Sequence, residues 1–210
     1  MILEPLVVGM LQTNCYLLGD PETGRAVVID PGGDSERIVA RLRKHGLTLE
    51  AILLTHAHFD HVLDAWTLKE ELGGEIYLHP EDKSLLNNRS VGLGAVFSSA
   101  AQKPKGEVDR WIREGDELAF GGIRLHVLET PGHTPGHVSF HCPEARCIFV
   151  GDTLFAGSIG RTDFPGGSYD RLIRSVREKI FVLDGETAVY TGHGPETTVA
   201  REMRTNPFFS

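Results

Sequence analysis

The chain is predicted to fold as an α/β protein, because short apolar, strand-like runs alternate with amphipathic helical patterns along it. Hydrophobic residues make up 40% of the sequence and charged residues 24%, values typical of a globular protein that can bury a large core. The length of 210 residues fits one domain, or at most two small ones. Because the sequence contains no linker, clear repeat or low-complexity tract, we expect one domain.

Strands are predicted where β-branched and apolar residues run together between turn residues. The first such run, Leu6–Leu18, bends near residues 11–13 and predicts two strands. Gly121-Gly122 predicts a hairpin turn later in the chain. The remaining predicted strands are Arg25–Asp30, Glu50–Thr55, Glu75–His79, Leu118–Phe120, Ile123–Glu129, Val138–His141, Cys147–Val150 and Ala188–Thr191.

Helices are predicted where apolar residues recur at helical spacing. Glycine follows two of these segments, at Gly46 and at Gly73-Gly74, and should end each helix. The stretch Asn87–Gly106 has the weakest pattern and is predicted to be a long loop with at most a short helix; such loops often bind ligands. The predicted helices run from Asp34 or Ser35 to His45, from Asp60 or His61 to Leu72, from Ser168 or Tyr169 to Leu183, and from Thr197 to Arg204.

The net charge of −8 argues against a general nucleic-acid-binding surface, so we expect no nucleic-acid partner. The three cysteines, Cys15, Cys142 and Cys147, are too few and odd in number for a secreted disulfide framework. We expect them to be buried or partly buried thiols without a catalytic role. The N-terminus lacks the features of a signal peptide, and no run approaches the roughly 18 apolar residues of a membrane span. The expectation is a cytoplasmic protein without membrane partners, as a monomer or small homo-oligomer.

One short segment, His56-Ala57-His58-Phe59-Asp60-His61, holds three histidines and one aspartate. Neutral imidazole is the commonest metal ligand in proteins, and carboxylates suit harder cations. His56 and His58 are two positions apart, so an extended backbone points both side chains to one side. Asp60 and His61 follow where the chain is predicted to turn into a helix, and they point elsewhere. This spacing suits two neighbouring metal ions better than one.

The same order recurs after other predicted strands: an apolar run, usually a small or turn-forming residue, and then an ionisable side chain. Strand C-termini that share one sheet edge bring such groups together, and active sites of α/β folds cluster there. Several arrangements of this kind, all bearing His or Asp, are better explained by one shared site than by chance. The ionisable residues in these positions are Asp30, His56, His133, Asp152 and His193.

With these motifs in this order, the sequence resembles the metallo-β-lactamase superfamily over nearly its whole length. The resemblance implies a four-layer αβ/βα sandwich with two divalent metal ions at one edge between two sheets. Zinc is expected first, and iron or manganese also fits mixed imidazole and carboxylate donors. The residues that the resemblance assigns to metals are His56, His58 and His133 for the first ion, Asp60, His61 and His193 for the second, and Asp152 for both.

Within the family, the sequence is most similar to glyoxalase II, the hydroxyacylglutathione hydrolases. Residues 130–137 (TPGHTPGH), 151–155 (GDTLF) and 160–163 (GRTD) carry this resemblance. Full-length glyoxalase II has an appended C-terminal helical domain whose basic residues help to bind glutathione. Only a short tail follows His193 here. We therefore expect a single metallo-β-lactamase-like domain over residues 1–210, with no appended C-terminal helical domain.

The resemblance implies a binuclear hydrolase for a small-molecule thioester such as S-lactoylglutathione, a glutathione conjugate. The expected nucleophile is a hydroxide that bridges two metal ions about 3.5 Å apart. The expected catalytic residues are Asp60, which orients the hydroxide, and Asp152, which bridges the ions. A thiolate leaving group has a pKa of about 8.5 and needs little help from a general acid. The motifs contain no obvious acid, which agrees with thioester hydrolysis.

Three residues outside the ligand motifs are candidates for supporting roles. Asp30 is expected to orient a ligand histidine or the turn that follows it. Arg161 is expected to bind a substrate carboxylate or, equally, to pair with Asp163. Tyr169 either contacts substrate in the pocket or packs in the core. The histidines expected to be structural or surface residues are His45, His79, His126, His137 and His141.

The main alternative is a persulfide dioxygenase, a mononuclear iron enzyme that shares this fold and the GRTD element. It would use His56, His133 and Asp152, a set suited to Fe(II) and O₂. A β-lactamase proper is disfavoured, since those enzymes typically lack the bridging aspartate and a histidine at the position of His61. A nuclease of this fold is disfavoured by the net charge of −8. A non-enzymatic metal-holding module needs a closed site, whereas glycine-rich loops around two of the ligands predict an open one.

Overall fold

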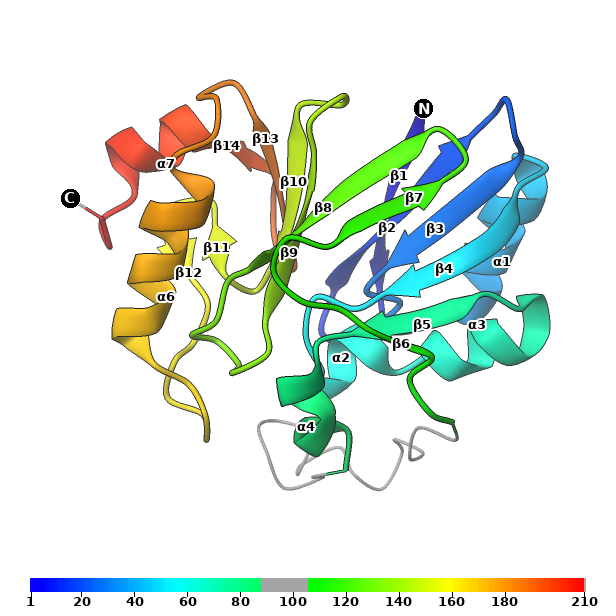
Figure 1. Cartoon of the computed structure of the whole chain (residues 1–210), viewed down its shortest axis with the longest axis horizontal. Coiled ribbons are helices and arrows are strands. Elements are labelled where there is room, and N and C mark those ends of the chain that lie inside the picture. The colour runs from blue at the N-terminus through cyan, green and yellow to red at the C-terminus, as the bar shows by residue number, and fades with distance from the viewer. Residues whose placement is uncertain (88–105, 210) are drawn as a thin grey trace.

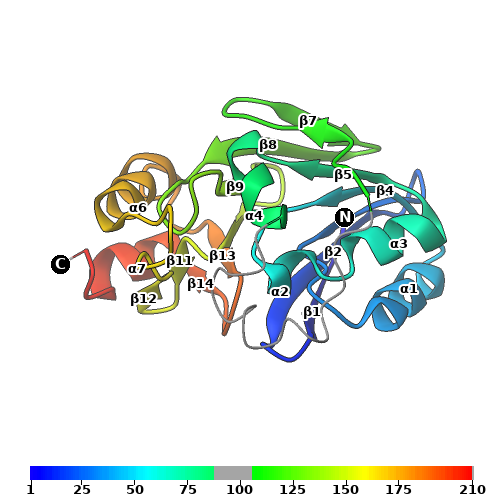
Figure 2. The same ribbon diagram turned by 90° about the horizontal axis from the view of Figure 1, so that it is seen from below.

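The computed structural model describes residues 1–87 and 106–209 and contains two six-stranded sheets that pack face to face. The strand order is β1-β2-β3-β4-β5-β6 in the first sheet and β14-β13-β10-β9-β8-β7 in the second. In Figure 1, helices α1 and α3 lie outside the first sheet, and α6 and α7 lie outside the second. Figure 2 shows the same two pairs of helices on opposite flanks. The predicted α/β sandwich of four layers is therefore confirmed.

The first sheet comes from the N-terminal part of the chain. β1 and β3 each pair antiparallel with β2, whereas β3, β4, β5 and β6 follow one another as parallel neighbours. The C-terminal ends of β3 and β4 therefore meet at one edge. The strands are β1 (Ile2–Val8), β2 (Thr13–Asp20), β3 (Arg25–Ile29), β4 (Thr48–Leu53), β5 (Glu75–Leu78) and β6 (Arg110–Trp111).

The second sheet comes from the C-terminal part of the chain. β9 lies antiparallel between β8 and β10, and β13 is parallel to β10, so β8, β10 and β13 run in one direction. A separate two-stranded hairpin, β11 (Leu154–Phe155) and β12 (Ser158–Ile159), follows β10. The strands of the sheet are β7 (Glu117–Phe120), β8 (Ile123–Glu129), β9 (Val138–Cys142), β10 (Cys147–Gly151), β13 (Ala188–Thr191) and β14 (Thr197–Thr198).

Helices α1, α3, α6 and α7 cover the outer faces of the sheets, and shorter helical turns lie in the connections between strands. Within the described ranges 1–87 and 106–209, none of them is long and apolar enough to cross a membrane. Their bounds are α1 (Ser35–Lys44), α2 (Phe59–Val62), α3 (Ala65–Leu72), the 3₁₀ turn η1 (Pro80–Asp82), α4 (Lys83–Asn87), α6 (Tyr169–Ser175), the π-helical segment η2 (Val176–Ile180) and α7 (Val199–Thr205).

Alternation along the strands divides the apolar core into three layers. In β4, Ile52 packs on the helix side of the first sheet, while Leu53 faces the second sheet. In β10, Phe149 lies between the sheets, and Ile148 packs on the side of α6. Because these central strands are buried on both faces, they are continuous apolar runs in the sequence. The buried thiols of Cys15, Cys142 and Cys147, all without disulfide partners, belong to these layers, in agreement with the prediction of buried thiols.

The predicted helix from Asp60 or His61 to Leu72 is wrong in one respect, because it is divided into α2 and α3. The backbone N–H of Asp64 donates to the carbonyl of Pro31 at 3.0 Å instead of continuing the helix. The Asp64 carboxylate accepts the N–H of Ser35 at 2.8 Å, which ties this break to the start of α1. Both contacts are tertiary, so helical periodicity does not predict the break.

The other differences are smaller. The predicted helix that ends at Leu183 changes to π-helical form after Ser175, where the N–H of Phe181 bonds to the carbonyl of Val176. The predicted C-terminal helix is preceded by the short strand β14. The pairs of residues in β6, β11 and β12 are too short to show a period of two and were not predicted. Most of the predicted loop Asn87–Gly106 lies outside the described residues.

We predict that Phe140→Ala destabilises the protein strongly. Phe140 is a fully buried side chain of the layer between the sheets. Its truncation should lower the free energy of unfolding by about 3–5 kcal/mol, because it removes apolar burial and leaves a cavity. Val182→Ala, at a side chain that is 68% exposed, should change that free energy by no more than about 0.5 kcal/mol. Urea unfolding of both variants checks the prediction; equal stabilities would contradict this placement of the core.

Candidate metal centre

All five ionisable residues predicted to follow strands lie at one edge of the sandwich. The parallel directions of β3 and β4 in one sheet, and of β8, β10 and β13 in the other, bring their C-terminal ends to this edge. The loop after β4 and the first turn of α2 add three more donors, His58, Asp60 and His61. The residues that follow the strands are Asp30, His56, His133, Asp152 and His193.

Close backbone contacts make this convergence possible. A Cβ atom on Gly32 would lie 1.5 Å from the carbonyl oxygen of Asp60, so only glycine lets the turn after β3 approach the start of α2. A Cβ on Gly192 would lie 2.1 Å from Oδ1 of Asp152. These two glycines keep the donor atoms near one another by leaving no side chain between them.

The first donor set contains three imidazole nitrogens. His58 Nδ1 lies 3.1 Å from His56 Nε2 and 2.8 Å from His133 Nε2. The three rings stand nearly edge to face, with interplanar angles of 82–89°. The set therefore points three nitrogens at one small volume, which is the arrangement that a metal ion requires.

The second donor set lies beside the first and includes a carboxylate. Asp60 Oδ2 lies 3.2 Å from His193 Nε2 and 3.6 Å from His61 Nε2. Asp152 stands between the sets: its Oδ1 is 3.4 Å from His61 Nε2, and its Oδ2 is 3.5 Å from His133 Nε2. The seven residues that the sequence resemblance assigned to metals are thus brought together, with Asp152 shared between the sets.

In His56, His61 and His133, the ring nitrogen that points away from the centre forms a hydrogen bond. This bond determines whether the other ring nitrogen carries a lone pair. His133 Nδ1 donates to the carbonyl of Arg161 at 2.7 Å, and His61 Nδ1 donates to Asp30 Oδ2 at 2.9 Å, because these oxygens only accept. The hydroxyl of Thr55 donates to Asp30 at 2.6 Å and accepts from His56 Nδ1 at 3.0 Å. The Nε2 atoms of these histidines are therefore unprotonated in the neutral rings.

These tautomers fit metal binding. Nitrogen lone pairs 2.8–3.1 Å apart repel one another unless a proton or a cation lies between them. Within the described part of the chain, the buried atoms His61 Nε2 and Asp152 Oδ1 have no hydrogen-bond partner. Buried polar atoms are rarely left unsatisfied, and an ion is one of the recognised explanations. The donor set and its orphaned atoms thus match a pair of metal ions.

Asp30 supports the site and is not a free donor to it. Its two oxygens accept from the Thr55 N–H at 2.8 Å, from the Thr55 hydroxyl and from His61 Nδ1. Its backbone has φ +51°, a left-handed conformation that aspartate adopts more readily than most residues. With its oxygens occupied in this way, Asp30 orients the His61 ring from behind.

The charges of the site shift several pKa values in the metal-free protein. Burial opposes ionisation of Asp152, but His61, His133 and His193 outweigh it and hold the pKa of that carboxyl well below its usual range. Burial also disfavours a charged His61, but Asp152, Asp60 and Asp30 outweigh it and raise its pKa. In the first set, burial and neighbouring histidines lower the pKa of His58 to about 3. The site therefore keeps Asp152 anionic and His58 neutral, and its carboxylates stabilise a positive charge at His61, as they would stabilise a metal ion there.

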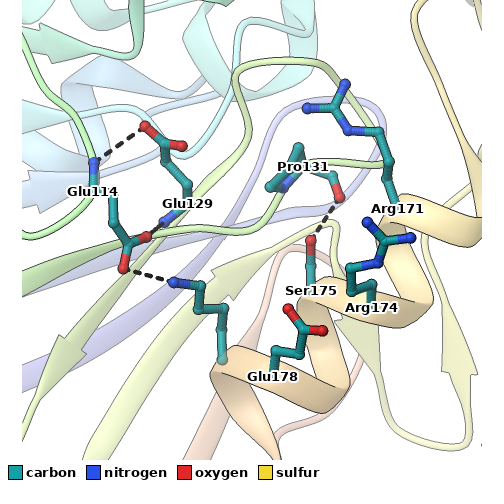
Figure 3. Close-up of a pocket in the computed structure, with 8 residues that line it drawn as sticks. Glu114, Glu129, Pro131, Arg171, Arg174, Ser175 and Glu178 are labelled. Carbon is teal, nitrogen blue, oxygen red and sulfur yellow. Dashed lines mark hydrogen bonds and ion pairs between the residues drawn. The ribbon is translucent and has the colours of Figure 1, made fainter.

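The loop that carries His133 is held from its outer side by α6. The hydroxyl of Ser175 donates to the carbonyl of Pro131 at 2.8 Å. Gly132 has φ +143°, and a Cβ there would lie 2.3 Å from the backbone nitrogen of Leu172. Figure 3 shows the Ser175 contact in the wall of a surface cavity of about 230 Å³. The lining of this cavity includes none of the seven predicted ligands, so it is separate from the metal centre.

The structure distinguishes the two predicted substrate contacts. Arg161 forms the ion pair with Asp163 that the sequence allowed, with N–O distances of 2.7 and 3.0 Å at the surface. Its guanidinium also stacks 4.2 Å from the ring centre of Phe164. Tyr169 is 47% exposed, so its alternative role in core packing is wrong. The role of either side chain in binding substrate stays a prediction.

Sequence reasoning missed residues of β2 that support the second donor set. The Thr13 hydroxyl donates to Asp60 Oδ2 at 3.3 Å. The Asn14 side-chain amide donates to the carbonyls of Thr191 and Gly194 at 3.0 and 2.8 Å, on either side of His193. These partners are about 180 positions apart in the chain, so no local motif marks them. His137, expected to be structural, is buried and accepts the backbone N–H of Asp152 at 3.1 Å.

A family model described as the metallo-beta-lactamase superfamily matches residues 8–193, which include the complete donor set. The chain belongs to this superfamily. Membership confirms the resemblance drawn from the motifs and explains why the donors of a two-metal site recur at the ends of these particular strands. It does not by itself choose a substrate, because one fold serves many reactions.

Three relatives are similar to this chain over nearly its whole length. The hydroxyacylglutathione hydrolase GloC of Haemophilus influenzae is 40% identical over 100% of this chain and 99% of the relative. The crystal structure of TTHA1623 in a di-iron-bound form is 44% identical, with a TM-score of 0.87 over 98% of this chain and 99% of the other. The crystal structure of the BLEG-1 B3 metallo-beta-lactamase is 36% identical, with a TM-score of 0.93 over the whole of both chains.

We predict that the histidines of this centre make the metal-free protein most stable near pH 6.5. Burial lowers the pKa of His58, so the unfolded chain binds more protons below about pH 6.5 and stability falls toward acid. Burial opposes protonation of His61 and His193, but their carboxylate neighbours outweigh it and raise both pKa values. Stability from these two is complete below about pH 6.5 and is lost as the pH rises through their folded values.

Thermal unfolding in the presence of a chelator, from pH 4 to pH 9, checks this prediction. The melting temperature should fall on both sides of a maximum. Double replacement of His61 and His193 by glutamine should remove the alkaline side of that fall. A melting temperature that rises steadily from pH 6.5 to pH 9 would contradict the assignment.

Proposed function

We propose that the protein is a binuclear metal-dependent hydrolase that cleaves a thioester such as S-lactoylglutathione. The observation that supports this most is the position of Asp152, with one oxygen 3.4 Å from His61 Nε2 and the other 3.5 Å from His133 Nε2. One carboxylate shared between two donor sets suits two metal ions held close together. The similarity to a hydroxyacylglutathione hydrolase supports the choice of a thioester.

The residues of the centre have different roles in the reaction. Two divalent ions, when bound, supply a water molecule activated at neutral pH and polarise the substrate carbonyl. Asp60 is held by Thr13 at 3.3 Å and by His193 at 3.2 Å, and we assign it the orientation of the attacking water. A thiolate leaving group, with a pKa of about 8.5, departs without a general acid. No acidic residue beyond the ligands is therefore required.

We propose that a carboxylate of the substrate binds next to Arg161. The Phe164 ring on which this side chain stacks lies 5.7 Å from the ring of His58. The partner of Arg161 is the exposed Asp163, and an exposed ion pair contributes little to stability. A substrate carboxylate can therefore replace Asp163 at small cost. Tyr169, which is exposed at the start of α6, is the second proposed contact.

One comparison supports a second candidate, the hydrolysis of β-lactams. The structure named a B3 metallo-beta-lactamase matches this chain over its full length. The same nucleophile and the same carbonyl polarisation serve both reactions. A β-lactam, however, releases an amine nitrogen that must gain a proton, whereas a thiolate does not. We place the thioester first because the described residues of the centre include no evident proton donor for that nitrogen.

We predict that the purified, zinc-loaded protein hydrolyses S-lactoylglutathione, measured as loss of the thioester absorbance. A chelator should abolish turnover. Asp152→Ala should lower kcat/KM by more than about 100-fold, because it removes the carboxylate shared by both donor sets. Substitutions of residues behind the metal ligands typically cost no more than that. Val182→Ala, at an exposed position in the turn after η2, is the control and should keep wild-type activity.

Each other result favours a specific alternative. Absence of turnover at full metal occupancy would reject S-lactoylglutathione, and hydrolysis of a chromogenic cephalosporin would then favour a β-lactam hydrolase. Oxygen consumption with a persulfide by protein that holds one iron would favour the persulfide dioxygenase. Full activity of Asp152→Ala with both metals retained would contradict the shared role of Asp152.

A further inference from the structure

Asp82 is a fully buried carboxylate that lies outside the seven predicted ligands. It ends η1, the short turn that follows β5. Its Oδ2 accepts the backbone N–H of Ala57 at 3.0 Å and the hydroxyl of Thr134 at 2.8 Å, and its Oδ1 accepts the N–H of Gly136 at 2.7 Å. These three donors satisfy both oxygens of the carboxylate.

The three donors come from the two loops that carry the first donor set. Ala57 lies between His56 and His58, and Thr134 directly follows His133. These loops belong to different sheets, since one follows β4 and the other follows β8. Asp82 is therefore a bridge across the gap between the sheets at the point where the three imidazole nitrogens converge.

The bridge is tightly packed and anchored. A Cβ on Gly136 would lie 2.7 Å from the backbone nitrogen of Asp82, so the second loop rests directly on η1. His79, which caps η1, accepts the N–H of Glu81 through Nδ1 and bonds through Nε2 to Glu129 at 3.0 Å. Glu129 is the last residue of β8, so the turn that holds Asp82 is also fixed to the strand that leads to His133.

We propose that Asp82 is a positioning residue that sets the spacing of the His56, His58 and His133 nitrogens and so controls the affinity of the first metal site. It acts through the two loops and does not touch the metal ion. The second donor set has its own supports in Thr13, Asn14 and Asp30. The inference rests on the metal centre of the proposed function, but not on its substrate.

Asp82→Asn tests this with little change in volume. The amide has one acceptor oxygen where the carboxylate has two, and its NH₂ group would face an N–H or hydroxyl donor. The loops should then move apart or leave a donor unsatisfied. Thr134→Val provides a milder second variant, because it removes one of the three donors and keeps the carboxylate.

Asp20 offers a matched control at the other end of β2. This carboxylate is also buried, and it too accepts two backbone N–H groups and one threonine hydroxyl: Glu22 N–H at 3.0 Å, Gly122 N–H at 2.8 Å and Thr23 Oγ1 at 2.6 Å. The strand begins beside the metal centre at Thr13 and ends at Asp20, about 23 Å away for an extended chain of this length. Asp20→Asn therefore imposes the same chemical change without reaching the ligands.

The experiment is a zinc titration of each purified full-length protein against a chromophoric chelator, with the melting temperature of each metal-free protein measured in parallel. We expect Asp82→Asn to weaken the binding of one zinc equivalent by about 10–100-fold, the range known for residues behind metal ligands. Thr134→Val should weaken the binding of the same equivalent by a smaller factor. Asp20→Asn should lower the melting temperature and bind zinc like the wild type.

Two results would overturn the inference. One is wild-type zinc affinity at every equivalent in Asp82→Asn. The other is an equal loss of zinc affinity in Asp20→Asn, since that would reduce the effect to general stability. Because zinc binding is measured without substrate, failure of thioester hydrolysis would leave this test intact.

Discussion

The imidazole nitrogens of the first donor set lie 2.8–3.1 Å apart, and those of His56 and His133 carry lone pairs because their outer nitrogens already donate hydrogen bonds. Such an array is repulsive unless a proton or a cation lies between the nitrogens. Much of the surrounding structure serves to maintain it. Asp30 and Thr55 fix rings from behind, close glycine contacts let the loops approach, and the carboxylates of Asp60 and Asp152 supply negative charge next to the nitrogens.

The fold provides this array through the directions of its strands. Two sheets packed face to face bring the ends of five strands to one edge, so that donors far apart in sequence meet there. A site between two sheets needs contacts that fix one sheet relative to the other. Asn14 provides such contacts for the loop of His193, and Asp82 provides them for the loops of His58 and His133. The hydrolytic function we propose depends on this alignment, since it requires two ions at a fixed separation.

Local sequence patterns predicted much of the fold and of the ligand set, whereas several contacts between residues far apart in the sequence were not predicted. The strand Arg25–Ile29 and the ligand motif from His56 to His61 are contiguous, so periodicity and spacing predict them. The convergence of the donors followed from the rule that active sites gather at strand C-termini. Asp82 was not predicted because its partners are 25 to 54 positions away and no motif surrounds it. The break at Asp64 likewise depends on Pro31 and Ser35, which helical periodicity does not include.

The central claim is that the chain holds two metal ions with Asp152 between them. Anomalous X-ray diffraction from crystals of the zinc-loaded protein tests it most directly. The account predicts two anomalous peaks about 3.5 Å apart, one among His56, His58 and His133 and the other among Asp60, His61 and His193, with one Asp152 oxygen or both between them. A single peak in the first set, with Asp60 and His193 bound only to each other or to water at full zinc loading, would contradict it.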